Sequence, residues 1–85
     1  MNKSYYFHSD PGHAWLAVKR AELHRLQIAH KISGYSYQKG NTVYLEEDGD
    51  ASIFMNAKRA LGEGVTFKET YQEHTPIRNY SFYTP

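Results

Sequence analysis

Residues 35–50 read Tyr35-Ser36-Tyr37-Gln38-Lys39-Gly40-Asn41-Thr42-Val43-Tyr44-Leu45-Glu46-Glu47-Asp48-Gly49-Asp50, and this stretch decides the fold of the chain. Two β-prone runs, residues 35–38 and 42–45, flank Lys39-Gly40-Asn41. Glycine and asparagine both tolerate the left-handed backbone conformations that a tight turn needs. The stretch therefore predicts a β-hairpin whose tyrosines lie beside an acidic run, residues 46–50.

The register of this hairpin has two alternatives. A two-residue loop at 40–41 would pair Tyr37 with Tyr44 and leave Ser36 and Gln38 facing the same side as Val43 and Leu45. A three-residue loop would instead gather a larger apolar set on one face: Tyr35, Tyr37, Val43 and Leu45. A slip of one residue moves every side chain to the other face of the sheet. We expect the three-residue loop, because it buries more apolar surface.

An earlier hairpin is expected where two β-prone runs, residues 5–8 and 13–18, are separated by Ser9-Asp10-Pro11-Gly12. Proline fixes φ for the turn, and glycine supplies the positive φ after it. With Pro11 and Gly12 at the centre of the turn, His8 faces Trp15 and Tyr6 faces Ala17. One face then holds Tyr6, His8 and Trp15, which we expect to be exposed, and the other holds Tyr5, Phe7, Leu16 and Val18.

Two amphipathic helices complete the pattern. The spacing of Ala21, Leu23, Leu26 and Ile28 predicts a helix over about 20–27. A second helix is predicted over 51–61, with Asp48 or Asp50 as its N-cap and Gly62 as its stop. Its apolar stripe consists of Ile53, Phe54, Ala57, Ala60 and Leu61.

Residues 65–71 alternate at period two and predict a fifth strand, whereas residues 74–83 are aromatic but interrupted by Pro76. We expect the latter segment to be a packed tail or a short edge strand. The order ββαββαβ, with tight turns within each strand pair, predicts an α+β fold. In this fold an antiparallel sheet of about five strands has two short helices packed on one face, and the other face meets solvent or a partner.

The composition limits the class of protein. A chain of 85 residues is expected to be a single domain, 1–85. It has no cysteine, which excludes disulfides, thiolate zinc sites and a cysteine nucleophile, and favours a reducing cytoplasm. No apolar stretch approaches the ~20 residues of a transmembrane helix, and the first residues lack the apolar region of a secretory signal. We therefore expect a soluble cytoplasmic protein.

The net charge of +1 lacks the strong basic bias of a dedicated nucleic-acid binder. The charge is uneven, however. Residues 1–38 carry five basic and two acidic side chains, a balance of +3, and residues 39–85 carry five basic and seven acidic ones, a balance of −2. This polarity either orients a partner or is ordinary solvated charge.

Few residues suggest reaction chemistry. His8, Asp10 and His13 bracket the first turn, but their spacing matches no metal-site signature. The acidic run 46–50 is too short for a calcium loop, and no nucleophile elbow or glycine-rich phosphate loop is present. We expect no metal, no other cofactor and no enzymatic activity.

Binding is the better interpretation of the aromatic and acidic residues. Tyrosine is over-represented at protein interfaces, although some tyrosines finish a small core with their hydroxyls at its rim. Helix capping accounts for Asp48 and Asp50 but leaves Glu46 and Glu47 for a basic partner surface. The expected partner-binding residues are Tyr6, Trp15, Tyr37, Tyr44, Glu46, Glu47 and Asp48.

Asp10-Pro11-Gly12-His13-Ala14-Trp15-Leu16-Ala17-Val18, together with residues 35–38 and 42–51, resembles small accessory proteins carried by bacteriophages and plasmids. Accessory proteins of mobile elements often bind and block a host defence component, as anti-CRISPR proteins do, so the resemblance implies an anti-defence function. The chain departs from the pattern of this group at Gln27, where a glycine would close the first helix.

Our first hypothesis is therefore a mobile-element protein in the cytoplasm of a bacterial host. It would bind and modulate or inhibit a host protein, such as a nuclease or CRISPR effector, through its aromatic sheet face and acidic patch. The alternative is a small nucleic-acid-binding module. In that case sheet aromatics would stack on unpaired bases, and phosphates would be contacted by Lys19, Arg20, Arg25 and Lys31.

Overall fold

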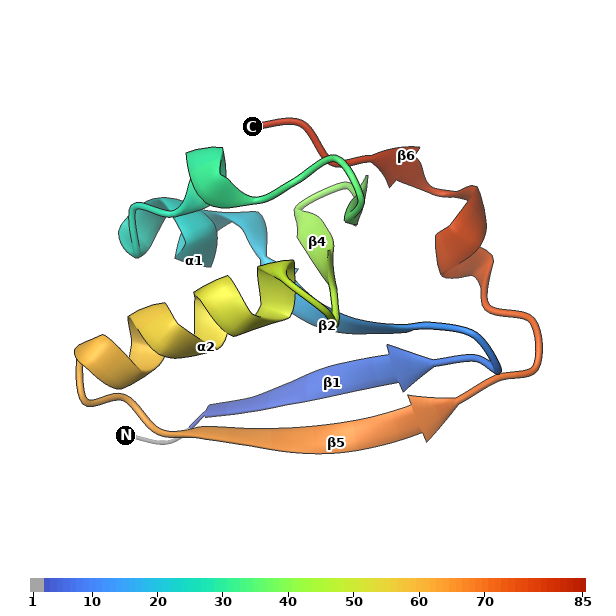
Figure 1. Ribbon diagram of the computed structural model, residues 1–85, viewed down its shortest axis with the longest axis horizontal. Coiled ribbons are helices and arrows are strands. Elements are labelled where there is room, and N and C mark those ends of the chain that lie inside the picture. The colour runs from blue at the N-terminus through green and yellow to red at the C-terminus, as the bar shows by residue number, and fades with distance from the viewer. Residues whose placement is uncertain (1–2) are drawn as a thin grey trace.

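Two α-helices lie on one face of a six-stranded mixed sheet in the computed structural model, which describes residues 3–85 (Figure 1). The strands are β1 (Lys3–Ser9), β2 (Ala14–Lys19), β3 (Tyr37–Lys39), β4 (Thr42–Glu46), β5 (Val65–Tyr71) and β6 (Ser81–Phe82). The helices are α1 (Arg20–Arg25) and α2 (Asp50–Ala60), and two short 3-10 turns are η1 (Ala29–Lys31) and η2 (Pro76–Asn79). The α+β class expected from the sequence is confirmed.

The strand order across the sheet is β5-β1-β2-β4-β3-β6. The expectation of about five strands, all antiparallel, is wrong in two respects. A sixth strand is present, and β5 runs parallel to β1, with Lys3 opposite Val65 and Ser9 opposite Tyr71. The direction of β5 follows from α2. A strand that follows a helix packed on the sheet returns parallel to the strand before that helix, which here is β4. β4 and β1 run in the same direction, because both are antiparallel to β2.

The first hairpin has the register predicted from its turn, but the expected positive φ at Gly12 is wrong, since the positive-φ residues among 3–85 are Gln27, Gly40 and Gly62. His8 lies opposite Trp15 and Tyr6 lies opposite Ala17 in the β1–β2 pair. The carboxylate of Asp10 stabilises the turn, since its Oδ1 accepts hydrogen bonds from the backbone N–H groups of Gly12 and His13. An aspartate is favoured in turns for this reason.

The second hairpin has the two-residue loop, so the expected three-residue loop is wrong. Tyr37 lies opposite Tyr44, and Gln38 lies opposite Val43. The register puts Ser36 into the core, where its Oγ donates to Asp50 Oδ2 over 2.6 Å. A buried carboxylate needs hydrogen-bond donors, and this requirement outweighs the larger apolar set that the other register would have buried.

Helix α2 begins one residue earlier than predicted, and neither Asp48 nor Asp50 caps it. Asp50 is buried and accepts hydrogen bonds from Ser33 and Ser36 instead. The cap is supplied by Glu46, whose carboxylate accepts from the N–H groups of Asp48, Gly49 and Asp50 over 2.8, 2.7 and 3.2 Å. A side chain from the preceding strand can satisfy the free N–H groups of a helix as well as a local cap does.

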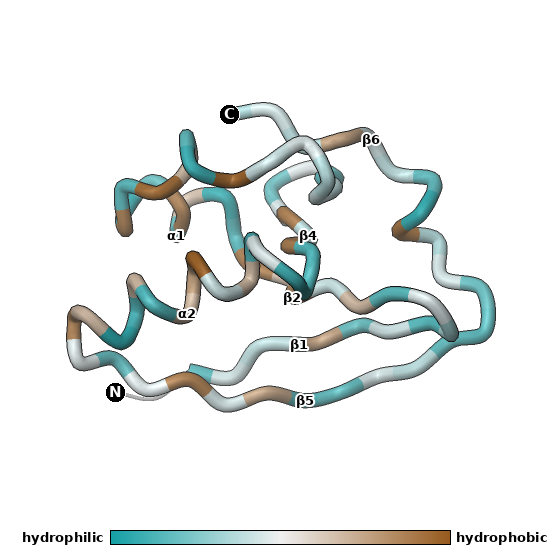
Figure 2. The backbone as a smooth tube through the Cα atoms, in the orientation of Figure 1, coloured by the Kyte–Doolittle hydropathy of each residue, from teal (hydrophilic) through white to brown (hydrophobic). Residues whose placement is uncertain are grey.

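The core fills the space between both helices and one face of the sheet. Its largest fully buried apolar side chains are Phe54, Leu16, Leu23, Leu45 and Val43. Figure 2 shows hydrophobic segments on α1, α2, β2 and β4 where these elements converge, and a hydrophilic connection after β5. Two members of the predicted α2 stripe, Ala60 and Leu61, are exposed, whereas Lys58 is buried.

The C-terminal segment combines both structures expected for it. Residues 76–79 form η2, and Ser81 and Phe82 form a short edge strand beside β3. Tyr83 closes the core, because its side chain is 3% exposed and its hydroxyl donates to the carbonyl oxygen of Ala29. None of the helices within residues 3–85 has the length and apolar character that crossing a bilayer would require.

Candidate functional site

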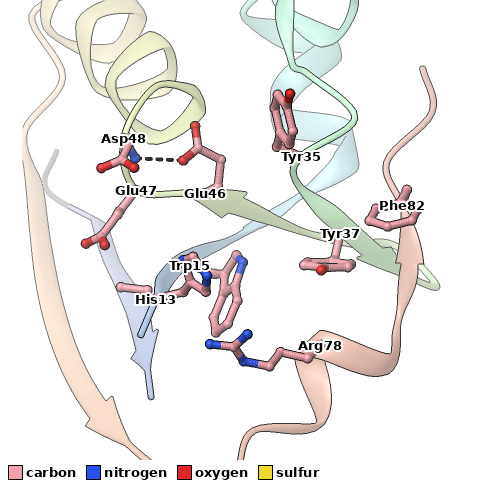
Figure 3. Close-up of a pocket in the computed structure, with 10 residues that line it drawn as sticks. His13, Trp15, Tyr35, Tyr37, Glu46, Glu47, Asp48, Arg78 and Phe82 are labelled. Carbon is pink, nitrogen blue, oxygen red and sulfur yellow. Dashed lines mark hydrogen bonds between the residues drawn. The ribbon is translucent and has the colours of Figure 1, made fainter. Parts of the chain in front are cut away.

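A groove of about 410 Å³ lies at the end of the sheet where β2, β3, β4 and β6 meet (Figure 3). We call it the acid-rimmed groove. Its aromatic residues are Trp15, Tyr35, Tyr37 and Phe82, its acidic residues are Glu46, Glu47 and Asp48, and it is also lined by His13, Ala14 and Arg78. Figure 3 shows the acidic side chains on one side, Tyr37 and Phe82 on the other, and Trp15 between them.

The aromatic wall follows from strand pairing. Tyr37 on β3 lies opposite Phe82 on β6, and their rings stack with centroids 5.3 Å apart. The Trp15 ring meets Tyr37 edge-on at 6.1 Å. Phe82 remains 64% exposed and Tyr35 81% exposed, so this wall presents apolar surface to solvent. Exposed aromatic surface beside polar groups is typical of binding sites.

Trp15 is the floor of the groove and not an exposed sheet residue as predicted, since only 3% of it is accessible. The Arg78 guanidinium, from η2, lies over its ring at 5.6 Å. Arg78 is in turn held by Asp10, whose carboxylate accepts from Nε and Nη2 of the guanidinium. The hydrogen bonds from Arg78, together with those from the turn amides, hold the pKa of the Asp10 carboxyl well below its usual range. The sequence pattern of β2 alone could not predict that Arg78 covers Trp15, because Arg78 lies more than sixty residues further along the chain.

The three acids of the groove have different tasks. Glu46 is committed to the N-terminus of α2, where its carboxylate accepts three backbone hydrogen bonds. The side chains of Glu47 and Asp48 are exposed, and neither forms an ion pair with any residue in 3–85. The groove therefore has two uncompensated negative charges at its mouth.

The other two predicted interface tyrosines lie away from the groove. Tyr44 packs against Tyr80 at 5.2 Å and borders a separate hollow with His8. Tyr6 is 50% exposed on the β1 side of the sheet, where Lys68 lies 6.0 Å from its ring. The structure brings Trp15, Tyr37, Glu46, Glu47 and Asp48 together, but not Tyr6 or Tyr44.

The four basic residues of the nucleic-acid alternative are not gathered on one surface hollow. Lys19 and Arg20 border one hollow, and Arg25 and Lys31 border another. Arg25 is paired with Glu63 over 2.8 Å, and the Arg20 guanidinium lies over the ring of Tyr83 at 5.2 Å. Two of these four side chains, Arg25 and Arg20, are therefore already engaged in contacts within the fold.

Sequence reasoning missed five residues that line the groove: His13, Ala14, Tyr35, Arg78 and Phe82. Phe82 and Arg78 belong to a segment expected as a tail or an edge strand, and its aromatic composition was the only available signal. The three-residue loop would place Tyr35 on the buried face, whereas the observed two-residue loop leaves it exposed.

The groove combines carboxylates with aromatic faces. Within residues 3–85, no three His, Cys, Asp or Glu side chains are arranged to hold a metal ion. His8, Asp10 and His13 are not among such groups. The ring of His8 instead contacts the hydroxyl of Thr70 at 2.9 Å, and burial lowers the pKa of this imidazole. Carboxylates beside aromatic faces attract cations by charge and by the negative face of the ring.

Comparison with protein-family models, with curated proteins and with solved structures finds no match to this chain.

Proposed function

We propose that this protein binds a partner protein by accepting a basic segment of that partner in the acid-rimmed groove. One observation carries the proposal: Glu47 and Asp48, which form no ion pair among residues 3–85, share the groove with the exposed aromatic side chains of Tyr35 and Phe82. A solvated acidic cluster alone would need no aromatic wall. Arginine and lysine side chains fit both features, because their apolar stems pack on rings while their charged ends reach carboxylates.

The fold already contains contacts of this kind. Arg78 lies over Trp15 at 5.6 Å, and the Lys39 ammonium lies 4.9 Å from the ring centroid of Tyr80. The groove volume of about 410 Å³ falls at the small end of the range for ligand pockets, ≈ 300–1,000 Å³. It suits one or two inserted side chains of a larger surface.

The resemblance to accessory proteins of bacteriophages and plasmids suggests which partner to test first. Host nucleases and CRISPR effectors hold nucleic acid in basic channels, and an acidic surface can occupy such a channel by electrostatic complementarity. In this proposal the protein inhibits or modulates a host protein of that kind. The free charges of Glu47 and Asp48 are the groups that would replace phosphates.

A charge-reversal experiment tests the proposal. The probe is a fluorescein-labelled arginine-rich peptide, and the readout is its anisotropy at low and high salt. The double variant Glu47→Lys with Asp48→Lys should lose most of the binding. The matched control, Glu69→Lys with Glu73→Lys, makes the same change in net charge on exposed residues outside the groove and should keep most of it.

Two results would contradict the proposal. Equal loss in both double variants would show that binding depends only on net charge, and full retention by the groove variant would remove the groove from consideration. A labelled single-stranded oligonucleotide provides the comparison in the same assay. Tighter binding of the oligonucleotide than of the peptide, weakened by salt, would favour the nucleic-acid-binding alternative.

A further inference from the structure

Within residues 3–85, the outer edge of β5 is the long unpaired edge of the sheet. β5 occupies one end of the strand order and has seven residues, whereas the strand at the other end, β6, has two. Four consecutive residues of β5, Thr66–Glu69, are exposed. A sheet edge of this kind presents unpaired N–H and C=O groups to another strand.

The parallel ladder with β1 determines which backbone groups point outward. Gly64 O accepts from Lys3 N, and Gln72 N donates to Ser9 O, so even-numbered residues turn their backbone groups toward β1. Successive residues of a strand alternate in this respect. The free groups therefore belong to the odd-numbered residues of β5: Val65, Phe67, Glu69 and Tyr71.

A second copy of the chain fits this edge in one register better than in the others. Residues directly opposite each other in an antiparallel pair point to the same face, so odd residues of one copy oppose odd residues of the other. The longest symmetric pairing would centre on Lys68, and a shift in one direction would centre on Glu69. Both place like charges opposite each other, which is destabilising.

The shift in the other direction centres the pair on Phe67. This side chain is 39% exposed and packs edge-on against Phe7 at 5.9 Å, so its copy would complete an apolar cluster. Glu69 then faces Val65 of the second copy, and Lys68 faces Thr66, without repulsion. We propose that two copies of this chain join through β5 in the antiparallel register centred on Phe67.

The dimer would extend the sheet without touching the acid-rimmed groove. β3 and β6 form the sheet edge opposite β5, so the two grooves lie at the outer ends of the joined sheet. A dimer with two separated grooves gains affinity for a partner that offers two basic segments at a matching distance. The pairing itself does not depend on what the groove binds.

Single-cysteine variants test the register, because the chain has no cysteine of its own. A hydrogen-bonded antiparallel pair places its Cα atoms about 5.5 Å apart, within the range that a disulfide bridges. Under mild oxidation Phe67→Cys should form a covalent dimer, whereas Lys68→Cys and Glu69→Cys should not. A covalent dimer from either of the latter, and none from Phe67→Cys, would overturn the register.

The association itself is tested by light scattering on the unmodified protein at high concentration. We expect twice the monomer mass, and a return to the monomer mass in Phe67→Pro. Proline removes an outward N–H and none of the bonds to β1, and circular dichroism checks that the variant is folded. The control Phe82→Ser removes an exposed aromatic at the opposite edge and should keep the doubled mass. A monomer at every concentration, or a dimer that survives Phe67→Pro, would refute the proposal.

Discussion

The ammonium nitrogen of Lys58 lies 3.3 Å from Oε1 of Glu22, although only 3% and 8% of these side chains are exposed. The hydroxyl of Tyr5 donates to both oxygens of the same carboxylate over 2.8 Å. This cluster joins β1, α1 and α2 in the core. Lys58 and Glu22 hold each other charged, since removal of one would leave the other as a buried charge without its partner.

Lys58→Met should therefore destabilise the protein by about 3 kcal/mol, because the carboxylate of Glu22 loses a buried partner. The double variant Glu22→Gln with Lys58→Met should cost less than the sum of the two single changes. Urea unfolding of the four proteins measures the coupling. Additive losses would show that the ion pair contributes nothing beyond its separate parts.

Acid should destabilise the folded protein, because its paired carboxylates lose their stabilising interactions when they are protonated. Hydrogen bonds from Arg25 and Lys58 lower the pKa of Glu63 to about 2, from 4.5. Burial alone would raise the pKa of Glu22, but the hydrogen bonds from Tyr5 and Lys58 outweigh it, so this pKa is also lowered. A lowered pKa stabilises the folded state above the unfolded value and loses that contribution as pH falls through the folded value.

The contribution of Glu63 to the midpoint of thermal unfolding should thus be complete above pH 4.5 and be lost between pH 4.5 and about 2. Glu63→Gln should flatten this part of the profile, while Glu47→Gln, which removes a carboxylate without an ion pair in residues 3–85, should leave it unchanged. An identical slope in all three proteins would contradict this assignment.

Glu46→Ala should cost about 1–2 kcal/mol, because three backbone N–H groups at the start of α2 lose their acceptor. Glu47→Ala is the adjacent control and should stay within about 0.5 kcal/mol of the parent. Denaturant melts of the two variants decide the matter. Equal stability of the two variants would show that Glu46 does not stabilise α2, and its carboxylate would then count as available to a partner.

Trp15→Ala should be among the most damaging changes, at about 3–5 kcal/mol, because the ring is buried beneath Arg78. The sequence pattern predicted an exposed ring and a smaller loss. Arg78→Ala should expose the ring, and its fluorescence emission would then shift to longer wavelength. An unshifted emission would mean that other residues cover Trp15.

Gln27→Gly should stabilise the protein by about 0.5–1 kcal/mol. Gln27 has φ of +58° at the end of α1, where Gln27 N donates to the carbonyl of His24 and Ile28 N donates to that of Leu23. Glycine adopts this left-handed conformation without the clash that a side chain introduces. A destabilised Gln27→Gly variant would show that the glutamine side chain makes a compensating contact.

The sequence was sufficient where the local signal was strong. The Pro11-Gly12 turn fixed the register of the first hairpin, and the apolar spacing located α2 to within one residue. Gly62 ends this helix as expected, with φ of +72°. In each case the decisive interactions lie within a few residues of each other.

The errors share one physical cause, which is a partner distant in the chain. The hydrogen bond from Ser36 to Asp50 favours a buried Ser36, and so the observed register of the second hairpin over the predicted one. Arg78 covers Trp15 from η2, and Phe82 completes the groove from β6. No pattern within a single segment contains these contacts, so the candidate site was only partly predictable.

The parallel pairing of β1 with β5 also has a consequence for biosynthesis. The hydroxyls of Ser4 and Thr66 meet across this ladder at a separation of 62 residues, and Tyr83 closes the core from the end of the chain. Distant pairing of this kind slows folding, because the intervening loop must close before any contact forms. The outer edge of β1 therefore stays without its parallel partner until residues 65–71 have been synthesised.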